Sequence, residues 1–124
     1  MQAVVDLYGP ADLTVMFEGA ARILLLPVFG TIDAESEIVS RASPVTYITS
    51  DDPPFLIMHG DKDTLVPLSQ SEILYDKLLA AQVSATLVVV KNGGHGFGAE
   101  GGPIAPSWGE IIDTISDFFA QHLK

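Results

Sequence analysis

The chain has 124 residues, of which 48% are apolar and 18% are charged, a balance typical of one ordered globular domain and not of a disordered segment. Its net charge of −10 repels phosphate backbones and anionic lipid, so we expect no nucleic-acid partner and no membrane partner. The absence of cysteine excludes disulfides, thiolate metal ligands and a cysteine nucleophile.

Three short apolar runs predict buried strands in chain order. They cover residues 2–9, 54–60 and 84–93. Their apolar residues are continuous and do not alternate with polar ones. This pattern is typical of strands that are covered on both faces, as in a parallel sheet.

Two longer segments have apolar residues at helical spacing. Residues 67–82 lie between the second and third runs, and the stripe through Leu74 and Leu78 predicts a helix there. Apolar residues at the same spacing in 106–124 predict a second helix with Ser107 as its N-cap. Residues 54–124 therefore form a strand–helix–strand–helix unit, with the first three elements making a βαβ crossover.

The segment 10–53 is less regular. Residues 11–26 and 33–42 are each compatible with a short helix, while 43–54 is rich in proline and predicts a loop. We interpret 1–124 as one domain of the α/β class, in which 10–53 is a variable segment and 54–124 carries the chemistry.

Two glycine-flanked stretches carry the candidate catalytic side chains. Asp61 and Asp63 follow the second strand in HGDKDTLVP, and His95 follows the third strand in NGGHGF. Because the carboxyl ends of adjacent parallel strands meet at one edge of a sheet, an aspartate and His95 can form a hydrogen-bonded acid–base pair there. The plainer interpretations are a loop histidine, capping aspartates, or a weak cation-binding Asp-x-Asp pair. His59 and His122 are expected to be buried or packing residues.

These stretches resemble the α/β-hydrolase family, in particular carboxylesterase and lipase-like members related to acetyl-esterases and prolyl-oligopeptidase-type domains. The resemblance runs nearly end to end, through AVVDLYGPADL, HGDKDTLVP and VVVKNGGHGF. It implies that Asp63 is the acid of a catalytic triad, that His95 is its general base, and that Asp61 is a supporting turn residue. It implies no cofactor and no metal.

The family's nucleophile is missing from the sequence. The serine should lie upstream of the acid in a G-x-S-x-G turn, and no such pattern occurs in the 124 residues. The upstream serines stand in no strand–turn–helix context; they are Ser36, Ser40, Ser43 and Ser50. The sequence therefore resembles the C-terminal half of a hydrolase. We expect residues 2–8 to form an unpaired sheet edge that joins a second copy of the chain or a missing N-terminal half.

The resemblance implies hydrolysis of a small carboxylic ester by a serine that this chain does not contain, so the chain alone should be almost inert. The candidate substrate-binding residues are apolar and lie in the variable segment: Leu13, Met16, Phe17 and Phe29. The alternative is a truncated or degenerate module that acts in assembly or binding without catalysis. MQAVVDLYG shows no signal-peptide pattern, and no apolar stretch is long enough to span a bilayer, so we expect a soluble cytoplasmic protein.

Overall fold

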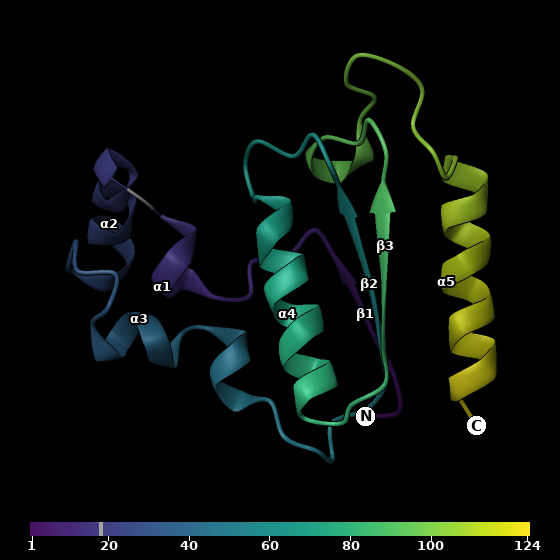
Figure 1. Cartoon of the computed structure of the whole chain (residues 1–124), viewed down its shortest axis with the longest axis horizontal. Helices are drawn as coiled ribbons and strands as arrows, with labels where there is room; N and C mark the ends of the chain where they lie inside the picture. The colour runs from purple at the N-terminus through teal and green to yellow at the C-terminus, as the bar shows by residue number, and fades with distance from the viewer. Residues whose placement is uncertain (18) are drawn as a thin grey trace.

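A computed structural model describes residues 1–17 and 19–124, and it contains a parallel sheet in the order β1-β2-β3. The strands are β1 (Val4–Leu7), β2 (Phe55–Gly60) and β3 (Ala85–Val90). All three predicted strands are confirmed, each shorter than its apolar run. Strand β2 lies in the middle, and it is the most deeply buried strand because it pairs on both sides (Figure 1).

One helix covers each face of the sheet, as the continuous apolar strands predicted. Helix α4 (Leu68–Ala80) packs Leu74 and Leu78 against the face that carries Ile57. Helix α5 (Trp108–His122) packs Ile111 against the opposite face, with Met58 (Figure 1). Both predicted helices are therefore confirmed.

Helix α5 begins where its sequence signal places it. The Ser107 hydroxyl accepts a hydrogen bond from the Glu110 amide at 3.3 Å, and the Glu110 carboxylate accepts one from the Ser107 amide at 3.2 Å. This reciprocal capping box satisfies amides that have no partner within the helix. Across the described residues, no helix is long and apolar enough to cross a membrane.

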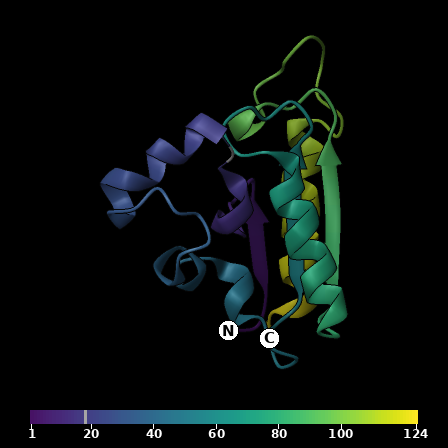
Figure 2. The same ribbon diagram turned by 60° about the vertical axis from the view of Figure 1, so that its left-hand side comes forward.

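The variable segment folds into short helical pieces beside the sheet, away from α5 (Figures 1 and 2). They are α1 (Leu13–Met16), η1 (Gly19–Leu25), α2 (Leu26–Phe29), α3 (Glu37–Arg41) and η2 (Pro44–Tyr47). The helix predicted over 11–26 includes Glu18, which lies outside the described residues; helical pieces flank it.

The loop predicted over 43–54 is wrong in its first part, where η2 forms a 3-10 turn. Pro44 stands in the first turn of η2. Proline lacks an amide hydrogen, but the first helical residues need no amide partner, and the fixed φ of proline suits a helix start. Pro44 therefore begins a helical turn, although the prolines of 43–54 predicted a loop there.

Candidate active site

The loops after β2 and β3 are joined at the carboxyl edge of the sheet. The Asp61 amide donates to the Val90 carbonyl at 3.1 Å, and the Lys62 amide donates to the Gly93 carbonyl at 2.9 Å. This approach requires glycine at position 60, because a Cβ there would lie 2.5 Å from the Gly93 carbonyl carbon and 2.9 Å from the Gly94 oxygen. The glycine that follows His59 in the sequence thus lets the two loops meet.

Asp61 adds a side-chain link between the same loops. Its Oδ1 accepts a hydrogen bond from the Asn92 amide at 2.8 Å. Asn92 has a positive φ of 59°, a conformation that asparagine tolerates better than most residues. Asp61 therefore holds the turn that leads into the loop of His95.

The structure brings the predicted acid and base together. Nδ1 of His95 lies 2.8 Å from Oδ2 of Asp63. The Asp63 side chain is fully buried, whereas the His95 side chain is 36% exposed. Because a carboxylate can only accept, Nδ1 carries the proton in this contact. In the singly protonated ring Nε2 is then the basic nitrogen.

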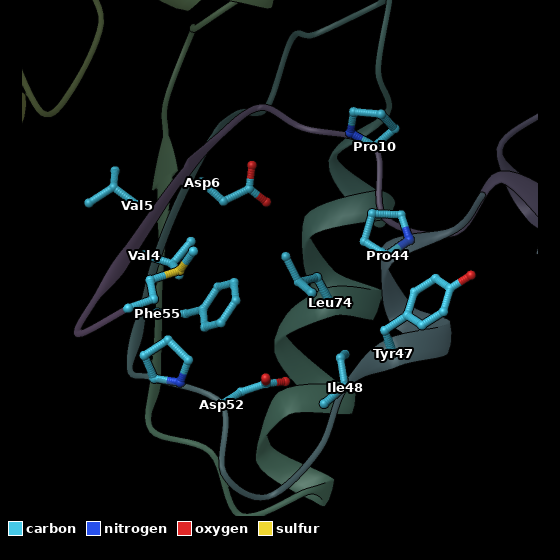
Figure 3. Close-up of a pocket in the computed structure, with 12 residues that line it drawn as sticks. Val4, Val5, Asp6, Pro10, Pro44, Tyr47, Ile48, Asp52, Phe55 and Leu74 are labelled. Atoms are coloured by element: carbon cyan, nitrogen blue, oxygen red, sulfur yellow. The ribbon is translucent and has the colours of Figure 1, made fainter. Parts of the chain in front are cut away.

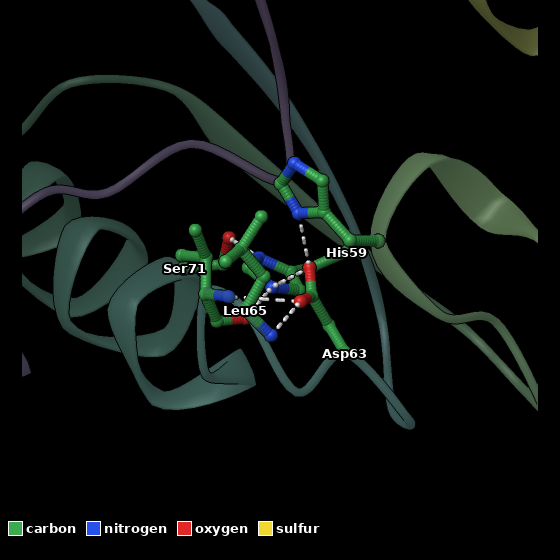
Figure 4. A network of polar contacts seen from close by, with 6 residues as sticks. His59, Asp63, Leu65 and Ser71 are labelled. Carbon is green, nitrogen blue, oxygen red and sulfur yellow. Dashed lines mark hydrogen bonds and ion pairs between the residues drawn. The ribbon is translucent and has the colours of Figure 1, made fainter.

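The other carboxylate oxygen of Asp63 closes a tight turn. Oδ1 accepts hydrogen bonds from the Leu65 amide at 2.9 Å and from the Val66 amide at 2.8 Å (Figure 4). Burial raises the pKa of Asp63, but the hydrogen bonds from these amides and from His95 outweigh burial, so the pKa lies below its usual value. Asp63 is therefore a carboxylate at neutral pH.

Aromatic rings fix the His95 imidazole from another side. Tyr8 directly follows β1 with a positive φ of 46°, and its ring meets the His95 ring edge-on with centroids 4.7 Å apart. Phe97 packs edge-on against Tyr8 at 4.9 Å. Tyr8 is not among the site residues predicted from the sequence, although a tyrosine at the carboxyl end of a strand, next to Gly-Pro, was a usable signal.

None of the four predicted substrate-binding residues lines either of two cavities that lie among the described residues. Leu13, Met16, Phe17 and Phe29 belong to the α1–α2 region and line neither cavity. Their role stays a prediction.

One of these cavities, of about 380 Å³, lies under β1. Val4, Asp6, Phe55 and Leu74 are among its lining residues (Figure 3). Burial raises the pKa of Asp6, although a backbone hydrogen bond at Gly9 and the nearby His59 partly oppose this. This cavity includes neither Asp63 nor His95.

Solved structures share this arrangement of strands and helices. A truncated form of a carbohydrate esterase from gut microbiota is 30% identical, with a TM-score of 0.77, covering 97% of this chain and 42% of that chain. The native structure of Thermogutta terrifontis esterase 2 is 20% identical, with a TM-score of 0.69 and the same coverage of both chains. The chain therefore has part of an α/β-hydrolase fold, as its sequence predicted.

The sequence comparisons identify the family of the chain within the α/β-hydrolase fold. The family profile BD-FAE matches residues 1–78, and the chain belongs to the BD-FAE family. The probable carboxylic ester hydrolase LipM of Mycobacterium tuberculosis is 37% identical, over 72% of this chain and 21% of LipM. Esterase LipC of the same organism is 32% identical, over 76% of this chain and 25% of LipC. The chain thus spans a quarter or less of the length of these two relatives.

Proposed function

We propose that this chain supplies the acid and the general base of a serine-dependent carboxylic ester hydrolase. Asp63 is the acid and His95 is the base. The observation that carries the proposal is the contact of 2.8 Å between Oδ2 of the buried Asp63 and Nδ1 of the partly exposed His95. Similarity to proteins named as esterases supports ester hydrolysis as the reaction class.

The pair is suited to move one proton back and forth during acyl transfer. Nε2 of His95 takes the proton of a serine hydroxyl while the serine oxygen attacks the acyl carbon, and the charge of Asp63 stabilises the resulting imidazolium. His95 then gives that proton to the alkoxide as the bond between the acyl carbon and the alkoxide oxygen breaks. The alkoxide leaves as an alcohol, and the acyl group stays on the serine as an acyl-enzyme. A water molecule, deprotonated by the same nitrogen, releases the carboxylic acid and frees the serine.

The serine comes from a segment outside these 124 residues, either elsewhere in a longer polypeptide or on a partner chain. No serine of the chain stands in a G-x-S-x-G turn. Without the nucleophile the covalent route is closed, and hydrolases that lose a triad member typically fall by about 10⁴–10⁶-fold in kcat. We therefore expect the isolated chain to be almost inert toward esters.

The free edge of β1 is the place where we expect such a partner to pair. Among the described residues β1 has a strand neighbour on the β2 side only, and exposed backbone groups on a strand edge favour pairing with another strand. Sedimentation of the chain at micromolar concentration tests this. We expect a concentration-dependent dimer, or a complex when a nucleophile-bearing segment is added. A chain that stays monomeric alone and does not bind such a segment would contradict pairing at the β1 edge.

The reaction is tested by fusing the chain to the nucleophile-bearing part of a related esterase. We expect a folded fusion to hydrolyse p-nitrophenyl acetate, and His95→Ala to lower its kcat by about 10⁴-fold or more. The matched control is His122→Ala, because His122 packs against Phe118 on α5, and it should leave kcat unchanged. A folded, active fusion that is indifferent to His95→Ala would contradict the proposal and favour a module without a catalytic role.

A further inference from the structure

A second histidine lies behind the acid, and the proposed reaction does not use it. His59 is the penultimate residue of β2 and is fully buried. Its Nε2 lies 2.8 Å from the Val66 carbonyl oxygen and 3.2 Å from Oδ2 of Asp63, while its Nδ1 lies 2.6 Å from the Ser71 hydroxyl. The sequence predicted a buried, hydrogen-bonded histidine here, and that is confirmed.

The partners of His59 decide which nitrogen carries the proton. A carbonyl oxygen can only accept, so Nε2 donates to Val66. In the singly protonated ring Nδ1 has no hydrogen, and the Ser71 hydroxyl donates to it. Ser71 lies on α4 (Figure 4) and is itself buried, so the helix fixes the orientation of the His59 ring, whereas the Val66 carbonyl fixes its tautomer.

Val66 links His59 to the proposed catalytic acid, Asp63. Its amide donates to Oδ1 of Asp63 at 2.8 Å, and its carbonyl accepts from His59 at 2.8 Å. The same residue is therefore held on one side by the acid and on the other by β2. If Val66 moves, the carboxylate of Asp63 turns with it, and its other oxygen leaves Nδ1 of His95.

We propose that His59 is a positioning residue that locks the 63–66 turn against α4 and so keeps Oδ2 of Asp63 aimed at His95. This inference rests on the proposed function, because it assigns His59 a purpose in the same acid–base pair. The competing interpretation is that His59 only fills space, in which case an apolar side chain of similar size would leave Asp63 in place.

The test is the hydrogen-bonded Nδ1 proton of His95, observed by NMR on the ¹⁵N-labelled chain. Its resonance is assigned by its absence in His95→Gln. In the unsubstituted chain we expect a protected downfield signal that Asp63→Asn removes. In His59→Leu its exchange with water should accelerate by about tenfold or more, the factor for the loss of one buried hydrogen bond.

A conservative replacement separates positioning from packing. His59→Gln keeps an amide N–H that can donate to the Val66 carbonyl, so the slow exchange of the His95 proton should return at least in part. A space-filling role predicts the opposite order, in which the leucine variant resembles the unsubstituted chain and glutamine brings no recovery.

If His59→Leu does not fold, two smaller substitutions still test the positioning role of His59. Ser71→Ala removes only the hydroxyl that orients His59. Its matched control is Ser43→Ala, because Ser43 is also a buried serine with two hydrogen bonds, from the Leu13 amide and to the Val39 carbonyl. We expect faster exchange of the His95 proton in Ser71→Ala than in Ser43→Ala at similar losses of stability.

The outcomes separate this inference from the proposed function. If the unsubstituted chain shows no protected Nδ1 proton, the acid–base pair itself is not formed and both proposals are overturned. If that proton is protected, and equally so in folded His59→Leu and in Ser71→Ala, then the pair stands and the positioning role of His59 is overturned.

Discussion

Gly60→Ala tests the close approach of the loops after β2 and β3, which carry Asp63 and His95. A Cβ at position 60 would lie 2.5 Å from the Gly93 carbonyl carbon and 2.9 Å from the Gly94 oxygen. The Gly93 carbonyl oxygen would lie closer still, and ordinary contact begins at 3.4 Å, so the loops must separate by more than about 0.9 Å. Overpacking of this kind costs about 1–3 kcal/mol, and strain on the backbone hydrogen bond from Lys62 to Gly93 adds about 1 kcal/mol. We expect the free energy of unfolding to fall by about 2–4 kcal/mol.

The same movement displaces His95 from Asp63, and a shift of about 1 Å at a catalytic group can cost about 10²-fold in rate. The assay is urea unfolding of the chain, together with ester hydrolysis by the fusion protein. Gly98→Ala is the matched control, because Gly98 lies in the loop of His95 with φ −62° and no heavy atom within 4 Å of its Cβ position. A free energy of unfolding for Gly60→Ala within about 0.5 kcal/mol of that for Gly98→Ala would mean that a Cβ at position 60 does not force the two loops apart.

Three further predictions concern single side chains. Asp63→Asn should lower the free energy of unfolding at pH 7, and its difference from the unsubstituted chain should shrink as the pH falls below about 4. The reason is that a carboxylate with a lowered pKa contributes stability above its unfolded pKa and loses it on protonation. Urea unfolding at several pH values would show a constant difference if this is wrong. Ser107→Ala should cost about 1 kcal/mol by removing the cap of α5, whereas Ser107→Asp should cost little; equal urea midpoints for the two variants would argue against the cap. Asp61→Ala should cost about 1 kcal/mol in urea unfolding, because it leaves the Asn92 amide without its carboxylate partner, and a change below about 0.3 kcal/mol would count against that link.

The sheet and its two covering helices could be predicted from the sequence because each rests on a local, repeated signal. Continuous apolar runs mark β2 and β3, and the apolar stripe through Leu74 and Leu78 marks α4. The meeting of Asp63 and His95 followed from topology, since the loops that follow neighbouring parallel strands share one edge of the sheet.

The supporting contacts could not be predicted in this way, because they join residues with no fixed spacing in the sequence. The place of Tyr8 at the end of β1 could have marked it as a residue of this sheet edge, but not its ring contact with His95, which lies 87 positions away and depends on a positive φ that nothing local requires. The bond from His59 to the Val66 carbonyl depends on how tightly the 63–66 turn closes. The sequence indicates that His59 is buried, but not which backbone oxygen receives its proton.

Covalent labelling by a fluorophosphonate, followed by intact mass and peptide mapping, tests most directly whether the nucleophile lies outside this chain and whether His95 activates it. We expect no adduct on the isolated chain. In the fusion protein we expect one adduct, on the serine of the added segment, and its formation should slow by about 10³-fold or more after His95→Ala. A stoichiometric adduct on a serine of these 124 residues would contradict the claim that the nucleophile lies elsewhere. Labelling of the fusion at an unchanged rate after His95→Ala would contradict the role of His95 as the base.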